Sequence, residues 1–245
     1  MENNACNDVA IVDHCTIDND KIGYWDAHVV LLGGGVDSSA ILSLVAAAQD
    51  PKKIRIVHID YGQKARKSEW DICNKQADYY NIPKHNVSQI RMDMSYATCG
   101  IMPDSTLDTG VAKNNVLELR NPLIMTFVAS YLATTNPGMK FQVYVGFHKE
   151  PLDTAFKDAV ATRYLSTLNR VIKMSISNQN TEVILRAPFK HRTRERILKR
   201  LVVARGMDFV KDYVHTCYEE VACGTCTHCK WLNTQLSFLE DSENV

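Results

Sequence analysis

Residues 29–39 read VVLLGGGVDSS, and this stretch decides the fold. The apolar run at 29–32 is typical of a short strand that is buried on both faces of a parallel sheet. The residues after Asp37, SSAILSLVAAA, form helix readily, so the three glycines occupy a turn between strand and helix. Such a turn leaves unpaired N–H groups at a helix N-terminus, where an anion is favoured. For three glycines alone, a tight connection without a ligand stays open as the alternative.

Composition and charge exclude several classes of protein. The 245 residues include 28 Lys plus Arg and 28 Asp plus Glu, and this zero net charge disfavours a strongly basic nucleic-acid binder. No apolar run approaches the roughly 18 residues of a membrane span, and the first residues lack the pattern of a signal peptide. We therefore expect a cytoplasmic protein with one large domain and appendages.

Strands and helices alternate along the rest of the sequence. We predict strands near 52–60, 85–92, 140–148 and 181–188, and helices at 65–82, 120–135, 155–176 and 193–206. The helix at 120–135 is apolar enough to be buried on most of its surface, and its apolar side chains could serve a homodimer. Residues 95–119 are predicted to form a long loop over the site. The alternation predicts an α/β fold, an open and mostly parallel sheet with helices on both faces.

This fold class indicates both a domain organisation and a place for the site. We expect an N-terminal arm or hairpin at 1–28, the α/β domain at 29–210 and a C-terminal helical segment at 211–245. Ligands of open parallel sheets bind beyond the carboxyl ends of the strands. That rule places residues 33–38, 60–63 and 146–148 along one rim.

The eight cysteines fall into two groups, and disulfides are not expected in a reducing compartment. Four of them are scattered, and we interpret them as small semi-buried residues or free thiols. These are Cys6, Cys15, Cys73 and Cys99.

The other four cysteines lie within the thirteen residues CYEEVACGTCTHC, at Cys217, Cys223, Cys226 and Cys229. Two cysteines separated by two residues can chelate one ion, and four thiolates complete the tetrahedral shell of Zn²⁺. The spacing therefore predicts a closed structural zinc site, with an iron–sulfur cluster as the rival. His228 is expected to be solvent-exposed or to support the ligands from outside.

Five segments follow one another in a characteristic order: GGGVDS at 33–38, HIDYGQKARKSE at 58–69, RNPLIM at 120–125, VGFHKE at 145–150 and the cysteine segment at 217–229. Together they resemble the 7-cyano-7-deazaguanine synthases, a family of the PP-loop ATP pyrophosphatase superfamily. The resemblance implies an adenine nucleotide alpha-hydrolase-like, Rossmann-like fold. It also implies an ATP- and Mg²⁺-dependent ligase that converts 7-carboxy-7-deazaguanine and ammonia to the nitrile through adenylated carboxylate and amide intermediates.

The resemblance also implies roles for particular residues. Asp37, Ser38 and Arg194 would be catalytic, with Asp37 holding Mg²⁺ or ordering the phosphates. The ATP-binding residues would be Leu32, Gly33, Gly34, Gly35, Val36, Asp37, Ser38 and Asp60, and the substrate-binding residues Tyr61, Gln63, Arg120, Asn121 and Asp158. Two alternatives stay open: Asp37 could cap the following helix, and Arg120 could belong to an internal salt bridge.

The chain departs from the family pattern in three places. Gly33 replaces the loop serine, Glu118 stands where a proline is common, and the YPDC segment becomes 156–159 with only Asp158 retained. These departures leave a second function open, a PP-loop ligase that stops at 7-amido-7-deazaguanine or joins a deazapurine to a macromolecular acceptor. A non-catalytic zinc-bearing scaffold is the third, and a transfer-RNA thiolating relative is disfavoured by the neutral charge.

Overall fold

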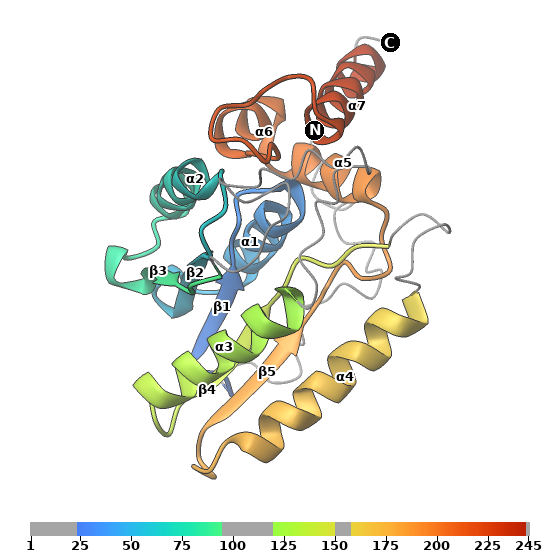
Figure 1. Cartoon of the computed structure of the whole chain (residues 1–245). Helices are drawn as coiled ribbons and strands as arrows, with labels where there is room; N and C mark the ends of the chain where they lie inside the picture. Colours follow the sequence, from blue (N-terminus) through green and yellow to red (C-terminus); the bar gives the residue numbers. More distant parts are fainter. Residues whose placement is uncertain (1–23, 95–119, 150–157, 244–245) are drawn as a thin grey trace, which may run out of the picture.

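The computed structural model describes residues 24–94, 120–149 and 158–243, with the side chains of 158–161 and 242–243 excepted (Figure 1). Residues 1–23 of the predicted arm at 1–28, the loop at 95–119 and residues 150–157 lie outside the described residues. The predicted boundary between the first two segments falls inside β1, because this strand already begins at Ala27. No helix within the described ranges combines the length and apolar character needed to cross a bilayer.

The described residues form one five-stranded sheet in which every strand pairing is parallel. Its strands are β1 (Ala27–Leu31), β2 (Ile54–Asp60), β3 (Val87–Arg91), β4 (Lys140–Tyr144) and β5 (Glu182–Arg186). Their order is β3-β2-β1-β4-β5, so the chain winds outward from β1 first to one edge and then to the other. The carboxyl ends of β1 and β4 therefore flank the switch point at which open α/β sheets bind ligands.

Helices cover both faces of the sheet, which confirms the predicted fold class (Figure 1). The core on one face of the sheet is formed with α1 (Val36–Ala48) and α2 (Arg66–Tyr79), and it continues into α5 (Arg194–Arg205), α6 (Met207–Tyr213) and α7 (Thr227–Glu243). The other face packs against α3 (Arg120–Thr135) and α4 (Asp158–Ser175). Short 3₁₀ turns at Pro51–Lys53 and Lys84–Asn86 lead into β2 and β3.

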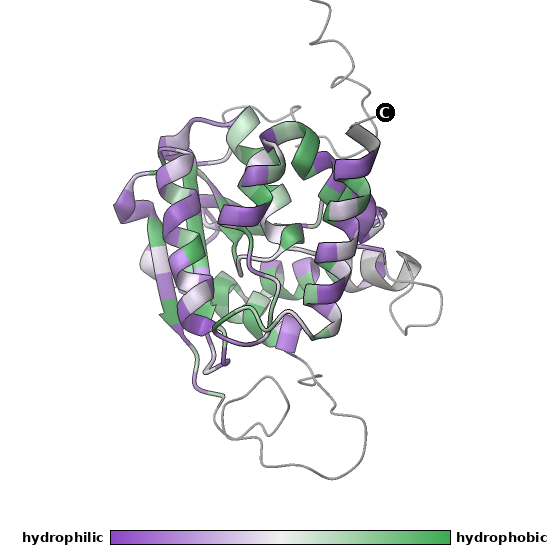
Figure 2. Cartoon of the chain, turned by 90° about the horizontal axis from the view of Figure 1, so that it is seen from above, coloured by the Kyte–Doolittle hydropathy of each residue, from purple (hydrophilic) through white to green (hydrophobic). Residues whose placement is uncertain are grey.

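Two hydrophobic cores follow from the alternation of side chains along the central strands. In β1, Val30 faces the core beneath α1, whereas Val29 faces the core beneath α3. Both valines are fully buried, as expected of a strand between two helix layers. Figure 2 shows the same principle in the helices, whose ribbons alternate between hydrophobic green and hydrophilic purple stretches.

One helix differs from its sequence-based prediction. The expectation that α3 is buried on most of its surface is wrong, because it buries mainly Met125, Val128, Ala129 and Leu132 and leaves Leu123 40% exposed. The helix predicted at 193–206 is confirmed, since α5 runs from its N-cap Thr193 to its C-cap Gly206, and a separate α6 follows. Gly206 separates the two helices. Its φ of 87° is costly for residues with a Cβ, so glycine suits this position.

The glycine turn gives a stability prediction with a control next to it. Gly34 has φ 74°, and a Cβ there would lie 3.2 Å from Cγ2 of Ile72. We expect Gly34→Ala to lower the free energy of unfolding by roughly 1–3 kcal/mol, through backbone strain and overpacking. In Gly33→Ala the new Cβ meets no atom within 4 Å, so the stability should hardly change. Urea unfolding of both variants tests this, and equal stabilities would contradict it.

Candidate functional site

The turn between β1 and α1 folds as the sequence predicts. Gly35 is the N-cap of α1 in an extended conformation, and the hydroxyl of Ser38 donates to its carbonyl at 3.2 Å. No side chain caps the helix, so the alternative role of Asp37 as an N-cap is not realised. The N–H groups of the first turn are therefore available to bind an anion. The helix dipole also favours negative charge at this end of the helix.

A cavity of about 340 Å³ opens beside this turn, at the switch point of the sheet. Its volume lies within the range of roughly 300–1,000 Å³ that small-molecule sites occupy. The walls come from both halves of the fold and from the cysteine segment. They include Leu32, Gly33, Gly35, Val36, Asp37, Ser38, Tyr61, Gln63, Glu69, Arg120, Gly146, Arg194, Cys217 and Tyr218.

Asp37 is held by a residue from the far side of the switch point. Its Oδ2 lies 3.0 Å from Nδ1 of His148, which follows β4. Its Oδ1 is buried and has no hydrogen-bond partner among the residues that the structure describes. A buried carboxylate oxygen without a donor is costly, and a bound cation would satisfy it. The wall formed by Gly146 packs close to this residue, since a Cβ on Gly146 would make van der Waals contact with Cβ of Asp37 at 3.4 Å.

Arg194 projects from the start of α5 and is held by α7. Its guanidinium lies over the ring of Trp231, with Cζ 4.3 Å from the centroid. Its Nη1 donates to Nδ1 of His228 at 2.9 Å, which requires that nitrogen to be unprotonated. Burial and the nearby Arg194 charge lower the pKa of His228, in keeping with a neutral ring. His228 is half-buried and lines the cavity. The expectation that it is solvent-exposed or supports the metal ligands from outside stays a prediction.

The residues predicted to bind a substrate are brought together only in part. Tyr61 and Arg120 line the cavity, and Nη1 of Arg120 lies 3.5 Å from the Tyr61 hydroxyl. Asn121 follows Arg120 in α3 but does not line the cavity. Asp158 opens α4, and its side chain lies outside the described residues, like the whole of 156–157. Burial raises the pKa of Tyr61 to about 12, so its hydroxyl stays protonated.

Two predicted ATP-binding residues lie at the edge of the cavity rather than in its wall. Gly34 faces α2, and its carbonyl accepts a hydrogen bond from the N–H of His215 at 2.8 Å. The carboxylate of Asp60 points toward the loop that follows it, where Oδ1 accepts a hydrogen bond from the N–H of Gly62 at 2.9 Å. Both residues shape the walls through backbone geometry.

The four clustered cysteines converge as predicted. The sulfur atoms of Cys217, Cys223, Cys226 and Cys229 all lie within 4.8 Å of one another. Thiolates at about 2.3 Å from a tetrahedral zinc ion would be about 3.8 Å apart, and the Cys217–Cys223 separation is 3.6 Å. Backbone N–H groups point at these sulfurs, and they lower the pKa of Cys223 to about 6. The cluster thus has the donor set and spacing to hold one metal ion.

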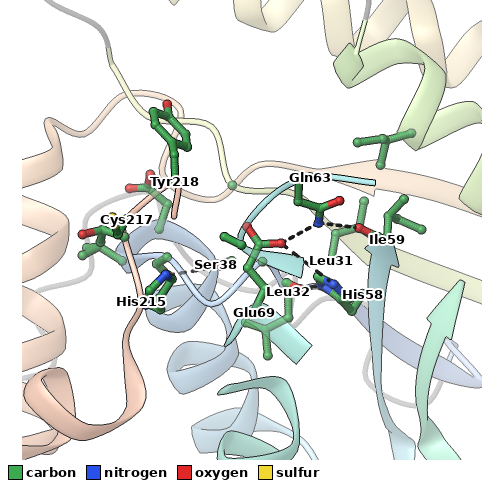
Figure 3. A pocket seen from close by; sticks show the side chains of 18 of the residues that line it. Leu31, Leu32, Ser38, His58, Ile59, Gln63, Glu69, His215, Cys217 and Tyr218 are labelled. Carbon is green, nitrogen blue, oxygen red and sulfur yellow. Dashed lines mark hydrogen bonds and ion pairs between the residues drawn. The ribbon is translucent and has the colours of Figure 1, made fainter. Parts of the chain in front are cut away.

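Sequence reasoning missed two polar residues on the β2 and α2 side, His58 and Glu69. His58 and Glu69 line the cavity, and Gln63 joins them through a hydrogen bond from its Nε2 to Glu69 Oε2 at 2.6 Å (Figure 3). Figure 3 shows this group across the cavity from Cys217 and Tyr218. His58 belongs to a buried strand and Glu69 to a polar helix, so neither carries a local signal of a site.

Comparison with known proteins decides the family. The sequence profile described as "Queuosine biosynthesis protein QueC" matches residues 27–237, which is most of the chain. The chain belongs to the QueC family. Its match covers all five strands, the glycine turn and the four cysteines.

Relatives of this QueC-family chain have modest sequence identity over most of its length. It is 25% identical over 215 residues to the 7-cyano-7-deazaguanine synthase of Chloroherpeton thalassium, covering 82% of this chain and 88% of the relative. The corresponding enzyme of Marinobacter nauticus is 28% identical over 215 residues, with 83% and 89% covered. That of Methanosarcina barkeri is 27% identical over 220 residues, with 82% and 89% covered.

One solved structure is similar at a low level. It is the U34-tRNA thiolase NcsA from Methanococcus maripaludis with its [4Fe-4S] cluster, at a TM-score of 0.45 and 15% identity. The alignment covers 90% of this chain and 67% of that protein. The parallel sheet and its two helix layers establish the fold of the QueC-family chain without this comparison.

Proposed function

We propose that the chain is an ATP-dependent carbon–nitrogen ligase that makes 7-cyano-7-deazaguanine from 7-carboxy-7-deazaguanine and ammonia. The observation that carries the proposal is the cavity at the switch point, where the glycine turn, Asp37 and Arg194 meet. Membership of the QueC family and the names of the relatives support the same reaction. Those relatives are nitrile-forming synthases, which favours the nitrile over an enzyme that stops at the amide.

The chemistry explains why such a cavity is needed. A carboxylate is a poor electrophile at neutral pH, so its oxygen first attacks the α-phosphorus of ATP and pyrophosphate leaves. Ammonia then displaces AMP, and the product is an amide. A second adenylation, on the amide oxygen, allows AMP to leave with that oxygen and forms the nitrile. The N–H groups at the start of α1 would bind the departing pyrophosphate in both rounds.

Charged residues would complete the nucleotide site. The unpartnered Oδ1 of Asp37 fits a ligand to Mg²⁺, and His148 would hold the carboxylate in place through Oδ2. Magnesium, when bound, would neutralise charge on the phosphates. Arg194 would add a fixed positive charge, and its buried Nε has no partner in residues 24–94, 120–149 and 158–243. Leu32 and Val36 would form the apolar floor beside the turn.

Substrate binding is assigned to the side of the cavity formed by Tyr61 and Arg120. The guanidinium of Arg120 would attract the substrate carboxylate, and the protonated Tyr61 hydroxyl would donate a hydrogen bond. The amide of Gln63 is already used within the protein, so its assignment to the substrate rests on the family resemblance. Asn121 and Asp158 stay assigned to the substrate by the family resemblance.

The C-terminal segment, in this proposal, is a structural zinc site. Four thiolates leave no open coordination position, which suits a structural role. The three-segment organisation, with the α/β domain at 29–210 and the zinc segment at 211–245, is proposed on the same basis; α6 spans that boundary. We also propose a cytoplasmic enzyme with small-molecule substrates.

Product analysis tests the function directly. The protein is incubated with 7-carboxy-7-deazaguanine, ATP, Mg²⁺ and ammonium, and the acid, amide and nitrile are resolved by mass spectrometry. We expect the nitrile, with two AMP released for each nitrile formed. Accumulation of the amide alone, or a product attached to a macromolecule, would replace the proposal with the second function. Absence of ATP turnover would overturn it.

The ring of Trp231 gives a prediction about nucleotide binding. Loss of the stacked ring in Trp231→Leu frees Arg194, and cation–π stacking is worth about 1 kcal/mol when the site is partly buried. We expect the KM for ATP to rise about fivefold, with a smaller change in kcat. Steady-state kinetics measure both constants. Trp231→Phe keeps a ring and should restore most of the affinity, whereas equal KM values in all three proteins would remove Trp231 from this role.

A further inference from the structure

The polar group formed by His58, Gln63 and Glu69 has a fixed hydrogen-bond direction. Oε1 of Gln63 accepts from the N–H of Tyr61 at 2.9 Å, so its Nε2 must be the atom that faces Glu69. That nitrogen donates to Glu69 Oε2 at 2.6 Å and to the Ile59 carbonyl at 3.0 Å. Both N–H bonds of the amide are thereby used. Glu69 is oriented by Gln63 and keeps its remaining lone pairs for another donor.

The tautomer of His58 follows from the same kind of argument. Its Nδ1 lies 3.1 Å from the Leu32 carbonyl, which can only accept, so Nδ1 carries the hydrogen. Burial lowers the pKa of His58, and the ring is therefore neutral with a lone pair on Nε2. Within the described part of the chain this nitrogen is buried without a hydrogen-bond partner, and it lies 3.9 Å from Glu69 Oε2 (Figure 3).

Two acceptors that face each other at this distance need a donor between them. His58 is 1% exposed, and its Nε2 has almost no accessible surface, which excludes the ring edge of a purine. Any donor that reaches this nitrogen can therefore be no larger than about a water molecule. An imidazole nitrogen is a poor ligand for hard cations such as K⁺ and Na⁺, which prefer oxygen. The negative charge of Glu69 favours a small cation with N–H bonds over neutral water.

We propose that Glu69 and His58 form the site that binds the ammonium ion consumed by the enzyme, and that Glu69 accepts its proton. This inference rests on the proposed function, because it concerns the nitrogen donor of that reaction. The site lies beside the glycine turn: a Cβ on Gly34 would be 3.7 Å from Cα of Glu69. Ammonia released there would be next to the turn that receives the departing pyrophosphate.

The step solves a chemical problem of the reaction. Ammonium predominates at neutral pH and has no lone pair with which to attack carbon. Transfer of one proton breaks an N–H bond, forms an O–H bond on Glu69 and leaves neutral ammonia with a free electron pair. That pair forms the new C–N bond as the C–O bond to AMP breaks. The second proton, released from the attacking nitrogen, can pass to Nε2 of His58.

The surroundings of Glu69 suit a proton acceptor. Burial raises its pKa to about 7, despite the hydrogen bond from Gln63 and the positive charge of Arg120, which act in the opposite direction. The charge of Asp60 adds to the increase. A base whose pKa is close to the working pH exchanges protons most effectively. Cys73 packs nearby, but burial keeps its thiol protonated by raising its pKa.

The test compares two nucleophiles in the Glu69→Gln variant. Hydroxylamine is unprotonated at neutral pH and needs no base, so it traps the adenylated carboxylate as a hydroxamate. We expect this variant to keep hydroxamate formation within twofold, while kcat/KM for ammonium falls at least tenfold. Asp71→Asn, an exposed change on the same helix, should alter neither rate. Parallel losses with both nucleophiles would mean that Glu69 serves adenylation or base recognition, and would overturn the inference.

A second variant separates binding from proton transfer. In His58→Asn the new amide can still donate to the Leu32 carbonyl, but the Nε2 acceptor is lost. We expect the KM for ammonium to rise about fivefold, with kcat for hydroxylamine unchanged. An unchanged KM for ammonium would remove His58 from the site.

A stability measurement gives a readout that does not require turnover. When the ammonium concentration is ten times its Kd, the melting temperature of the wild-type protein in ammonium chloride should be about 3 °C higher than in the same concentration of potassium chloride. Glu69→Gln should lose this difference. Equal melting temperatures in the two salts would indicate a buried water and overturn the ammonium site. If the difference is present but no product forms, the ammonium site stands and the proposed ligase is refuted.

Discussion

Asp37→Asn should reduce the release of pyrophosphate and AMP by at least about 100-fold. Removing one preorganised electrostatic interaction with a transition state costs roughly 10²–10³ in rate. The structural reason is the unpartnered, buried Oδ1, which in our proposal binds the metal that accompanies ATP. An amide cannot supply that charge, although it can still accept the hydrogen bond from His148.

The fold should survive this change. Asparagine has the shape of aspartate, and it removes a buried charge that lacks a partner for one of its oxygens. We therefore expect a melting temperature equal to that of the wild type or higher. Charges in active sites are often retained at a cost in stability, which their removal relieves. Asp241→Asn, an exposed change in α7, is the matched control and should keep full activity. Unchanged AMP release in Asp37→Asn would remove Asp37 from the mechanism.

The second large effect is expected from the cysteine cluster. Cys226→Ser removes one of four thiolate ligands, and metal binding in such sites is coupled to folding. Structural zinc contributes roughly 10–16 kcal/mol in zinc-finger peptides. Loss of even a third of this would lower the melting temperature by roughly 10 °C, at about 2–4 °C for each kcal/mol in a protein of this size.

Metal analysis and a second cysteine complete this experiment. The wild type should contain one zinc ion per chain by mass spectrometry of the metal, and Cys226→Ser should contain much less. Cys73→Ser is the control, because this buried thiol donates to the Leu32 carbonyl and a hydroxyl can replace it. If the wild type contains iron and absorbs visible light near 400 nm, the cysteines hold the rival iron–sulfur cluster and not zinc. A metal-free wild type with an unchanged melting temperature would contradict the structural role.

The parts of the fold that could be predicted are those with a local cause. The strand, glycine turn and helix at 29–48 follow from composition alone, and the order of elements determines a parallel sheet with two helix layers. The spacing of the four cysteines fixes their convergence, since all of them lie in one short segment. The rim formed by residues 33–38 and 146–148 follows from the rule for open sheets.

The remainder depends on contacts between distant segments. Trp231 and His228 meet Arg194 only because α7 packs against the start of α5, and no local pattern indicates this. The single buried face of α3 was missed because apolar composition does not reveal how much of a helix finds a partner. The exposed side of this helix does not test the predicted homodimer, which stays a prediction.

The backbone hydrogen bond from His215 to Gly34 links a residue that is synthesised late to one that is synthesised early. A ribosome completes the glycine turn early, but the wall that carries Cys217, Tyr218 and Trp231 emerges only near the end of translation. A nascent chain therefore has its glycine turn long before it has a complete pocket. If the pocket binds nucleotide as we propose, this ability is delayed until nearly the whole polypeptide has left the exit tunnel.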